Sequence, residues 1–249
     1  MAEELDKHVA AGSAPLAGDT HSRWMDDLRT THQASLKRDT GDIANDQTWI
    51  TADQKGLETA QKIIDNGGQL LNMLDSGVLL NSNQAKPLAD SLLHLHATMT
   101  GLNNADRAGD LSAIAKDDKD AKGEQRVIDA DTAALKNVTD PAMRELLNQD
   151  TGLKTNLIAN ELGDKQNEQN YALHDQADND TNRRVIAALK SGNADELRAA
   201  LHDSIASKQT IIGDRTEDLG LEPRYVAADR ADLTLNQPLL DILGSRKKK

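Results

Sequence analysis

Three sets of polar residues in this sequence have types that can do chemistry. The first is the segment 118–129, where Asp118, Asp120 and Gly123 stand at positions one, three and six of a calcium-loop pattern, with Asp129 at position twelve. Lys122 and Arg126, however, occupy positions where such a loop needs oxygen ligands. A cation at those positions repels the metal, so a solvated turn is the favoured interpretation.

The second set is the histidine pair His94 and His96. Two residues that are two positions apart on a helix point to different faces, unlike the i, i+4 pair of a zinc-binding helix. We therefore expect histidines at the surface or its rim, and no metal site.

The third set consists of four glutamates that could pair as general acid and base: Glu58, Glu145, Glu161 and Glu168. Their spacing singles out no two of them, and the aromatic platforms of a sugar-binding cleft are missing. The sequence also contains no P-loop, no GxGxxG and no GxSxG motif. It therefore predicts no catalytic, cofactor-binding or metal-binding residues, and a chain that is not an enzyme.

The side chains available to form a hydrophobic core around any such site are mostly aliphatic. The 249 residues include no Phe, no Cys, two Trp and two Tyr. Aromatic side chains normally dominate core energetics, so this chain must build thin seams from Leu, Ile and Ala. We expect Trp24 and Trp49 to anchor helix–helix contacts. Without Cys, disulfides and thiolate metal sites are excluded.

The charge of the chain is strongly acidic, with 41 acidic against 29 basic side chains and a formal net charge of −12. Phosphate binding requires a basic surface, so sequence-specific nucleic acid is not expected as a partner. Most of the acidic residues are Asp, which favours helix caps and turns over helix interiors. The bias predicts several medium-length helices with many ends.

Apolar residues recur at helical spacing along most of the chain. We expect one helix over about 20–37 that ends before Gly41, and a second that ends at Asn66–Gly68. Residues 102–124 read as turn-rich. Asp140–Pro141 and Asn193 with Glu196 predict helix starts. Segment 163–184 is polar, and is either a solvated helix or a flexible connection. No alternating pattern predicts a strand, and no internal repeat is evident.

These patterns predict an all-α fold, an elongated multi-helix bundle with a mostly irregular C-terminal docking tail. The expected divisions are a mobile arm over 1–19, a helical body over 20–212 and a tail over 213–249. The tail ends in an apolar plug followed by four cations. The predicted partner-docking residues are Leu239, Leu240, Ile242, Leu243, Arg246, Lys247, Lys248 and Lys249. An acidic body would attract this tail in a neighbouring copy, which favours a homo-oligomer.

The lack of Cys, the polar helical segment Asp164–Asn170 and the ending Gly244–Lys249 together resemble the structural proteins of tailed bacteriophages. The resemblance implies an internal virion protein, ejected with the DNA or forming a core, with portal or coat as further partners. Alternatives are a scaffolding protein with a basic coat-binding C-terminus, or a soluble helical adaptor or effector.

The resemblance also implies synthesis in the host cytoplasm and a place in the virion. The acidic start Met1–Asp6 does not resemble a signal peptide, and no window predicts an integral membrane span.

Overall fold

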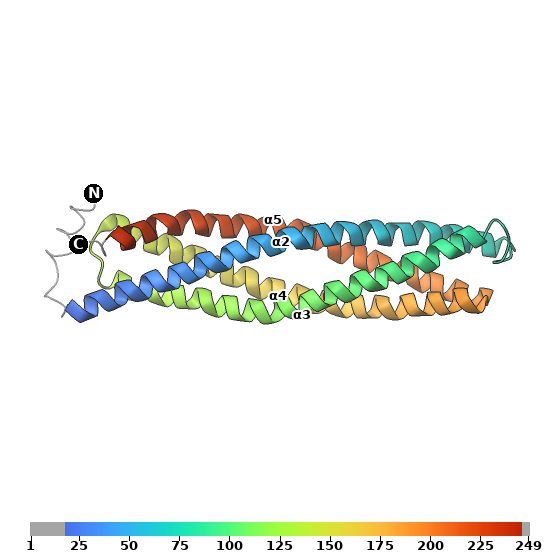
Figure 1. Cartoon of the computed structure of the whole chain (residues 1–249), viewed down its shortest axis with the longest axis horizontal. Helices are drawn as coiled ribbons and strands as arrows, with labels where there is room; N and C mark the ends of the chain where they lie inside the picture. Colours follow the sequence, from blue (N-terminus) through green and yellow to red (C-terminus); the bar gives the residue numbers. More distant parts are fainter. Residues whose placement is uncertain (1–17, 246–249) are drawn as a thin grey trace. The chain divides into compact units, whose positions relative to one another are not determined.

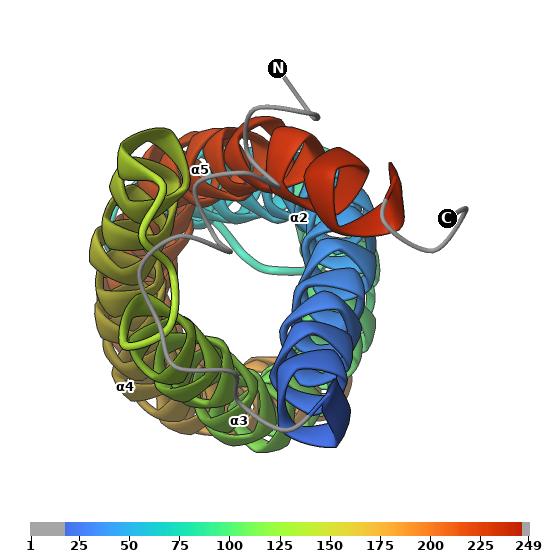
Figure 2. The ribbon, with the colours of Figure 1, turned by 90° about the vertical axis from the view of Figure 1, so that its left-hand side faces the viewer.

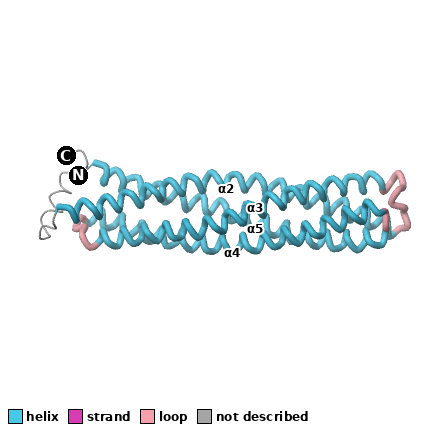
Figure 3. The backbone as a smooth tube through the Cα atoms, turned by 60° about the horizontal axis from the view of Figure 1, so that its bottom comes forward, coloured by secondary structure: helices cyan, strands magenta, loops and turns pink. Residues whose placement is uncertain are grey.

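The computed structural model describes residues 18–245, with side chains described for 23–243. These residues form four helices and no strand (Figures 1 and 3). The helices are α2 (Gly18–Asp75), α3 (Lys86–Leu135), α4 (Pro141–Ser191) and α5 (Ala194–Ser245). The all-α prediction is confirmed. Helix α2 ends before Gly77 and α4 before Gly192, which both adopt positive φ, where glycine is favoured at a helix end.

Two predicted helix starts are confirmed by their capping contacts. Asp140 Oδ1 accepts a hydrogen bond of 2.8 Å from the backbone N–H of Met143 at the start of α4. Asn193 Oδ1 accepts bonds of 3.1 and 3.3 Å from the backbone N–H groups of Asp195 and Glu196 at the start of α5. Local capping chemistry therefore places these two helix ends.

The chain divides into two compact units. Unit 1 comprises Met1–Asp46, Ala115–Lys165 and Pro223–Lys249, and unit 2 comprises Gln47–Ile114 and Gln166–Glu222. Each of the four helices contributes one segment to each unit. In unit 1 these segments surround a common interior (Figure 2). The expected divisions at residues 19 and 212 stay predictions, and residues 1–17 of the arm lie outside the described part of the chain.

Each unit has its own apolar cluster. In unit 1 the cluster includes Leu28, Leu147 and Leu239, with Trp24 packed against it. In unit 2 it includes Ile63, Leu92 and Leu201. The apolar stripes seen in the sequence therefore pack against one another within each unit. Trp24 and Trp49 both serve as the expected anchors, since Trp49 packs on α3 at Gly109.

Interior positions follow a heptad spacing, in which steps of four and three residues alternate. Along α2 the buried or half-buried positions are 28, 32, 35, 39, 42, 46, 49, 53, 56, 60, 63, 67, 70 and 74. Many of these positions hold polar residues, among them Asp39, Asp42, Asp46 and Asp53. The spacing thus continues where the apolar pattern stops.

This continuity corrects several expectations about helix ends. Gly41, Asn66–Gly68 and the predicted turn over 102–124 all lie inside helices. Segment 163–184 is helical, as one of the two alternatives predicted, but part of it is buried and not solvated. The irregular C-terminal tail is not confirmed, because α5 runs to Ser245. Pro223 and Pro238 lie on the exposed face of α5, so the heptad positions on its inner face remain unbroken.

Candidate functional site

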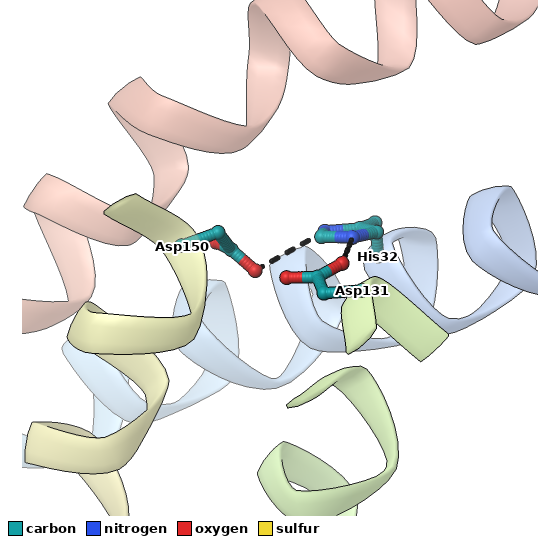
Figure 4. A group of neighbouring side chains, drawn as sticks. All are labelled: His32, Asp131 and Asp150. Atoms are coloured by element: carbon teal, nitrogen blue, oxygen red, sulfur yellow. Dashed lines mark hydrogen bonds and ion pairs between the residues drawn. The ribbon is translucent and has the colours of Figure 1, made fainter. Parts of the chain in front are cut away.

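Three buried side chains from three helices of unit 1 form the group that we term the triad: His32 on α2, Asp131 on α3 and Asp150 on α4 (Figure 4). Each is no more than 1% exposed. His32 Nε2 lies 2.9 Å from Asp131 Oδ1, and His32 Nδ1 lies 3.8 Å from Asp150 Oδ2. One ligand atom from each residue lies within 4.8 Å of the other two. Heptad spacing places all three side chains on the inner faces of their helices, and the register of the three helices brings them to the same level.

Asn236 on α5 fixes the orientation of the histidine ring. Its Nδ2 donates hydrogen bonds of 2.8 Å to Asp150 Oδ1 and of 2.8 Å to Asp232 Oδ1. The amide oxygen is therefore the atom that faces His32 Nδ1, with which it makes a close contact. An amide oxygen can only accept, so Nδ1 carries a proton and donates it to Asn236.

A buried lysine lies beside the triad. Lys154 Nζ donates a hydrogen bond of 2.5 Å to Ser35 Oγ, forms an ion pair with Asp232, and lies 2.9 Å from Glu124 Oε2. Burial by itself lowers the pKa of Lys154, but Glu124 and Asp232 more than offset burial and raise it. Lys154 is therefore a fixed positive charge in the core of unit 1.

Unit 2 contains the same types of residue in a similar network. His96 Nδ1 forms a hydrogen bond of 2.7 Å with Asn182 Oδ1, and Asn182 Nδ2 donates a hydrogen bond of 3.1 Å to Asp178 Oδ2. Lys208 Nζ pairs with Asp178 Oδ1 at 2.5 Å. Among the described residues of unit 2, no carboxylate forms a hydrogen bond or ion pair with the His96 ring, and burial lowers its pKa to about 4. In unit 1, Asp131 and Asp150 overcome the effect of burial and raise the pKa of His32.

The second feature of unit 1 is a cavity of about 50 Å³. Its lining includes Lys116, Tyr225 and six carboxylates: Asp42, Asp46, Asp117, Glu161, Asp164 and Asp229. Lys116 Nζ lies 2.6 Å from Asp42 Oδ1. Burial raises the pKa of Asp229 to about 8 and that of Glu161 to about 9. The single ammonium group of Lys116 cannot balance the charge of six carboxylates. Some of these carboxyl groups must therefore be protonated for the cavity to be electrically neutral.

Unit 2 has an equivalent cavity of about 20 Å³, enough for one water molecule. Arg215 Nη1 lies 2.7 Å from Asp53 Oδ1, and its Nη2 lies 2.6 Å from Asp106 Oδ2. Burial raises the pKa of Asp175 to about 8 and that of Asp110 to about 7. Both units therefore enclose more carboxylates than cations.

The interior residues reveal an internal repeat that the sequence analysis missed. Residues of α4 recur in α5 54 positions later (154 to 208): Lys154 and Lys208, Asp164 and Asp218, Glu168 and Glu222, Tyr171 and Tyr225, Asp175 and Asp229, Asp178 and Asp232, and Asn182 and Asn236. Residues of α2 recur in α3 64 positions later (32 to 96): Leu28 and Leu92, His32 and His96, Asp42 and Asp106, Asp46 and Asp110, and Asp53 and Asp117. The signal becomes visible only when heptad interior positions are compared.

The residues singled out from the sequence lie in different parts of the fold. His94 is exposed as expected, but His96 is fully buried, so the prediction of a rim position for it was wrong. Residues 118–129 are helical, so neither a calcium loop nor a solvated turn forms there. Glu161 and Glu168 line the cavities of different units, whereas Glu58 and Glu145 are exposed.

The predicted docking residues are divided between the core and the outer face of α5. Leu239 and Leu243 lie in the apolar cluster of unit 1, and Leu240 and Ile242 are half-buried. Arg246, Lys247, Lys248 and Lys249 lie outside the described residues. Their role in docking stays a prediction.

Comparisons with protein-family models, with curated proteins and with solved structures gave no match to this chain. Within residues 18–245, none of the helices combines the length and apolar character needed to span a membrane.

Proposed function

We propose that the chain is a non-enzymatic structural protein that oligomerises into a helical assembly, as an internal protein of a bacteriophage virion. The observation that supports a structural role is the heptad spacing of the interior positions, which is typical of coiled-coil building blocks. The interior cavities of about 20 and 50 Å³ are also far smaller than the several hundred Å³ of ligand pockets.

Assembly on this proposal uses the outward faces of the helices and the basic end of the chain. The apolar stripes are already covered within each unit, so they are not available to pair between copies. The chain has a formal net charge of −12, and the four cations over 246–249 are opposite in sign to it. An attraction of this kind between exposed charges weakens as salt rises.

The oligomeric state of the full chain tests the proposal. Mass photometry at low and high salt should show oligomers that dissociate as salt rises. Removing residues 246–249 should reduce assembly, whereas removing the N-terminal residues 1–4 is the length-matched control. A chain that stays monomeric at low salt, or assembles equally well without its basic end, contradicts this mechanism. Mass spectrometry of purified particles would then separate an internal virion protein, which is retained, from a scaffold, which is expelled.

A second candidate function is that of a soluble helical adaptor. It is favoured by an open hollow of about 730 Å³ in unit 2, beside the connection between α2 and α3. Leu74, Val78, Leu80 and Leu189 line the hollow, as does Leu79, which is 72% exposed. A monomer at every salt concentration would favour this candidate over the assembly protein.

A further inference from the structure

The triad of unit 1 has the ligand types and the spacing of a metal site. Its three ligand atoms lie within 4.8 Å of one another, so a point within about 2.8 Å of all three exists. Zinc bonds to histidine nitrogen and carboxylate oxygen at roughly 2.0–2.2 Å. Small movements of two aspartate side chains would therefore bring all three residues into coordination distance.

The histidine is oriented as a ligand by its neighbour on α5. His32 Nε2 faces Asp131 at 2.9 Å, whereas Nδ1, the ring nitrogen nearer Asp150, donates its proton to Asn236. Histidines that bind metals nearly always donate their other ring N–H to a fixed acceptor, which sets the tautomer and the ring orientation. Asn236 meets this requirement, and Asp150 and Asp232 in turn hold its amide group.

Two carboxylate oxygens of the triad receive no hydrogen bond within the described residues, although Asp150 Oδ2 also forms the 3.8 Å ion pair with His32 Nδ1. Asp131 and Asp150 are 0% and 1% exposed, and Asp131 Oδ2 and Asp150 Oδ2 accept no hydrogen bond from any described residue. Figure 4 shows the two carboxylates pointing toward each other beside the ring. Leaving a buried carboxylate oxygen without a partner is costly, and a cation between the two groups would satisfy both.

The internal repeat shows that these two carboxylates are additions to the shared network. Unit 2 keeps the histidine, asparagine, aspartate and lysine of unit 1. At the positions equivalent to Asp131 and Asp150, however, it has Gly67 and Ser204, both buried. The hydrogen-bond network therefore forms without acids at these positions. Their presence in unit 1 alone calls for a role specific to that unit.

We propose that His32, Asp131 and Asp150 bind one divalent first-row transition-metal ion, Zn²⁺ in the first instance. One imidazole nitrogen with two carboxylates suits Zn²⁺ or a neighbouring transition metal better than Ca²⁺ or Mg²⁺, which take oxygen ligands. Two negative carboxylates balance the charge of the ion. The site is enclosed by the core, as structural metal sites are, and the ion would connect α2, α3 and α4 of unit 1. This site goes beyond the proposed assembly role and does not depend on it.

Metal titration of the untagged full-length chain, after removal of metals with EDTA, tests the site. Calorimetry with Zn²⁺, and visible absorption with Co²⁺, should each show one ion bound per chain. Zn²⁺ at 100 times its Kd should raise the melting temperature by roughly 5–10 °C. In ¹H–¹⁵N spectra of the imidazoles, Nε2 of His32 should shift with Zn²⁺ while the ring of His96 stays unchanged.

Substitutions identify the ligands. Asp150→Ser introduces the residue that unit 2 has at this position, and it should weaken binding at least ~100-fold, more than the 10–100-fold typical for loss of a second-layer contact. Asn236→Ala should weaken binding by that smaller factor. The matched control is His96→Gln, which should leave the Kd unchanged.

Three results would overturn the proposal. One is the absence of stoichiometric Zn²⁺ binding, and another is an unchanged Kd for a folded Asp150→Ser variant. The third is binding of Zn²⁺ that leaves the His32 resonances unmoved, which would place the ion at another site on the chain. The last measurement uses the unmodified chain, so it decides the question even where a variant does not fold. Oligomeric state does not enter this test, so the site and the assembly role fail independently.

Discussion

Replacing Asp229 with asparagine removes one ionisable group from the cavity of unit 1 while keeping the shape of the side chain. Asp229 is 8% exposed, and burial together with the nearby Asp42 and Asp46 raises its pKa from 3.8 to about 8. Between these two pH values the folded chain keeps a proton that the unfolded chain releases. The free energy of unfolding therefore falls as pH rises from 3.8 to about 8, and it levels off above that range.

The size of this effect follows from the difference between the two pKa values. Each pH unit over this range corresponds to about 1.4 kcal/mol, which makes ~6 kcal/mol the upper bound for an isolated group. Asparagine stays neutral and avoids the loss. We expect Asp229→Asn to be more stable than the parent by on the order of 3–5 kcal/mol at pH 9, and by less than about 2 kcal/mol at pH 5. In a chain of this size, the difference at pH 9 raises the melting temperature by roughly 10 °C.

Thermal and urea unfolding, followed by circular dichroism at pH 5 and pH 9, measures both differences. Asp129→Asn is the matched control, because Asp129 is exposed on α3 and its substitution should change stability little at either pH. The reasoning fails if Asp229→Asn is no more stable than the parent at pH 9. It also fails if the gain is the same at pH 5 and pH 9, because the gain would then not come from ionisation.

Further substitutions test the packing and the buried charges. Gly109→Ala should destabilise the fold by about 1–3 kcal/mol in urea unfolding, because a Cβ there would overlap the Trp49 ring. As a control, Gly101→Ala should stabilise the fold by up to ~1 kcal/mol, because its Cβ meets no neighbour within 4 Å. Lys154→Met leaves Asp232 buried without its cation, whereas Glu124 keeps its ion pair with Arg38, and the substitution should cost roughly 3–5 kcal/mol. Loss of the exposed Lys86–Asp90 pair through Lys86→Met should cost less than about 1 kcal/mol. Equal losses from the two lysine substitutions would contradict the structural role assigned to Lys154.

The fold class could be predicted because helical periodicity and caps are local signals. Asp140 and Asn193 supply side-chain acceptors to the first turns of α4 and α5, and both helix starts were found from sequence. The lengths of the helices could not be predicted in the same way. Gly41 and Gly152 lie exposed within helices, where their low propensity is outweighed by the packing of the interior positions on either side.

The candidate site was harder to predict, because its residues are polar and lie far apart in the chain. His32 lies in the helix predicted over 20–37, but nothing in the sequence brings it next to Asp131 or Asp150. Their proximity depends on the register of three helices. A search for repeats restricted to heptad positions would have paired His32 with His96 and Asn236 with Asn182. Two matching pairs of polar residues at interior positions would have indicated a buried polar network from the sequence alone.

The surplus of Asp over Glu and the absence of Phe have a common explanation in this interior. An Asp carboxylate at a heptad position stays within its own layer of the bundle, close to partners such as Lys116 or Arg215. The longer Glu side chain reaches further from its own layer. Large aromatic rings would displace these polar layers, and Trp49 fits only because Gly109 faces it. From the sequence, the excess of Asp is expected to lie in helix caps and turns. Much of it lies instead on the buried faces of long helices, so the many helix ends that it predicts do not form.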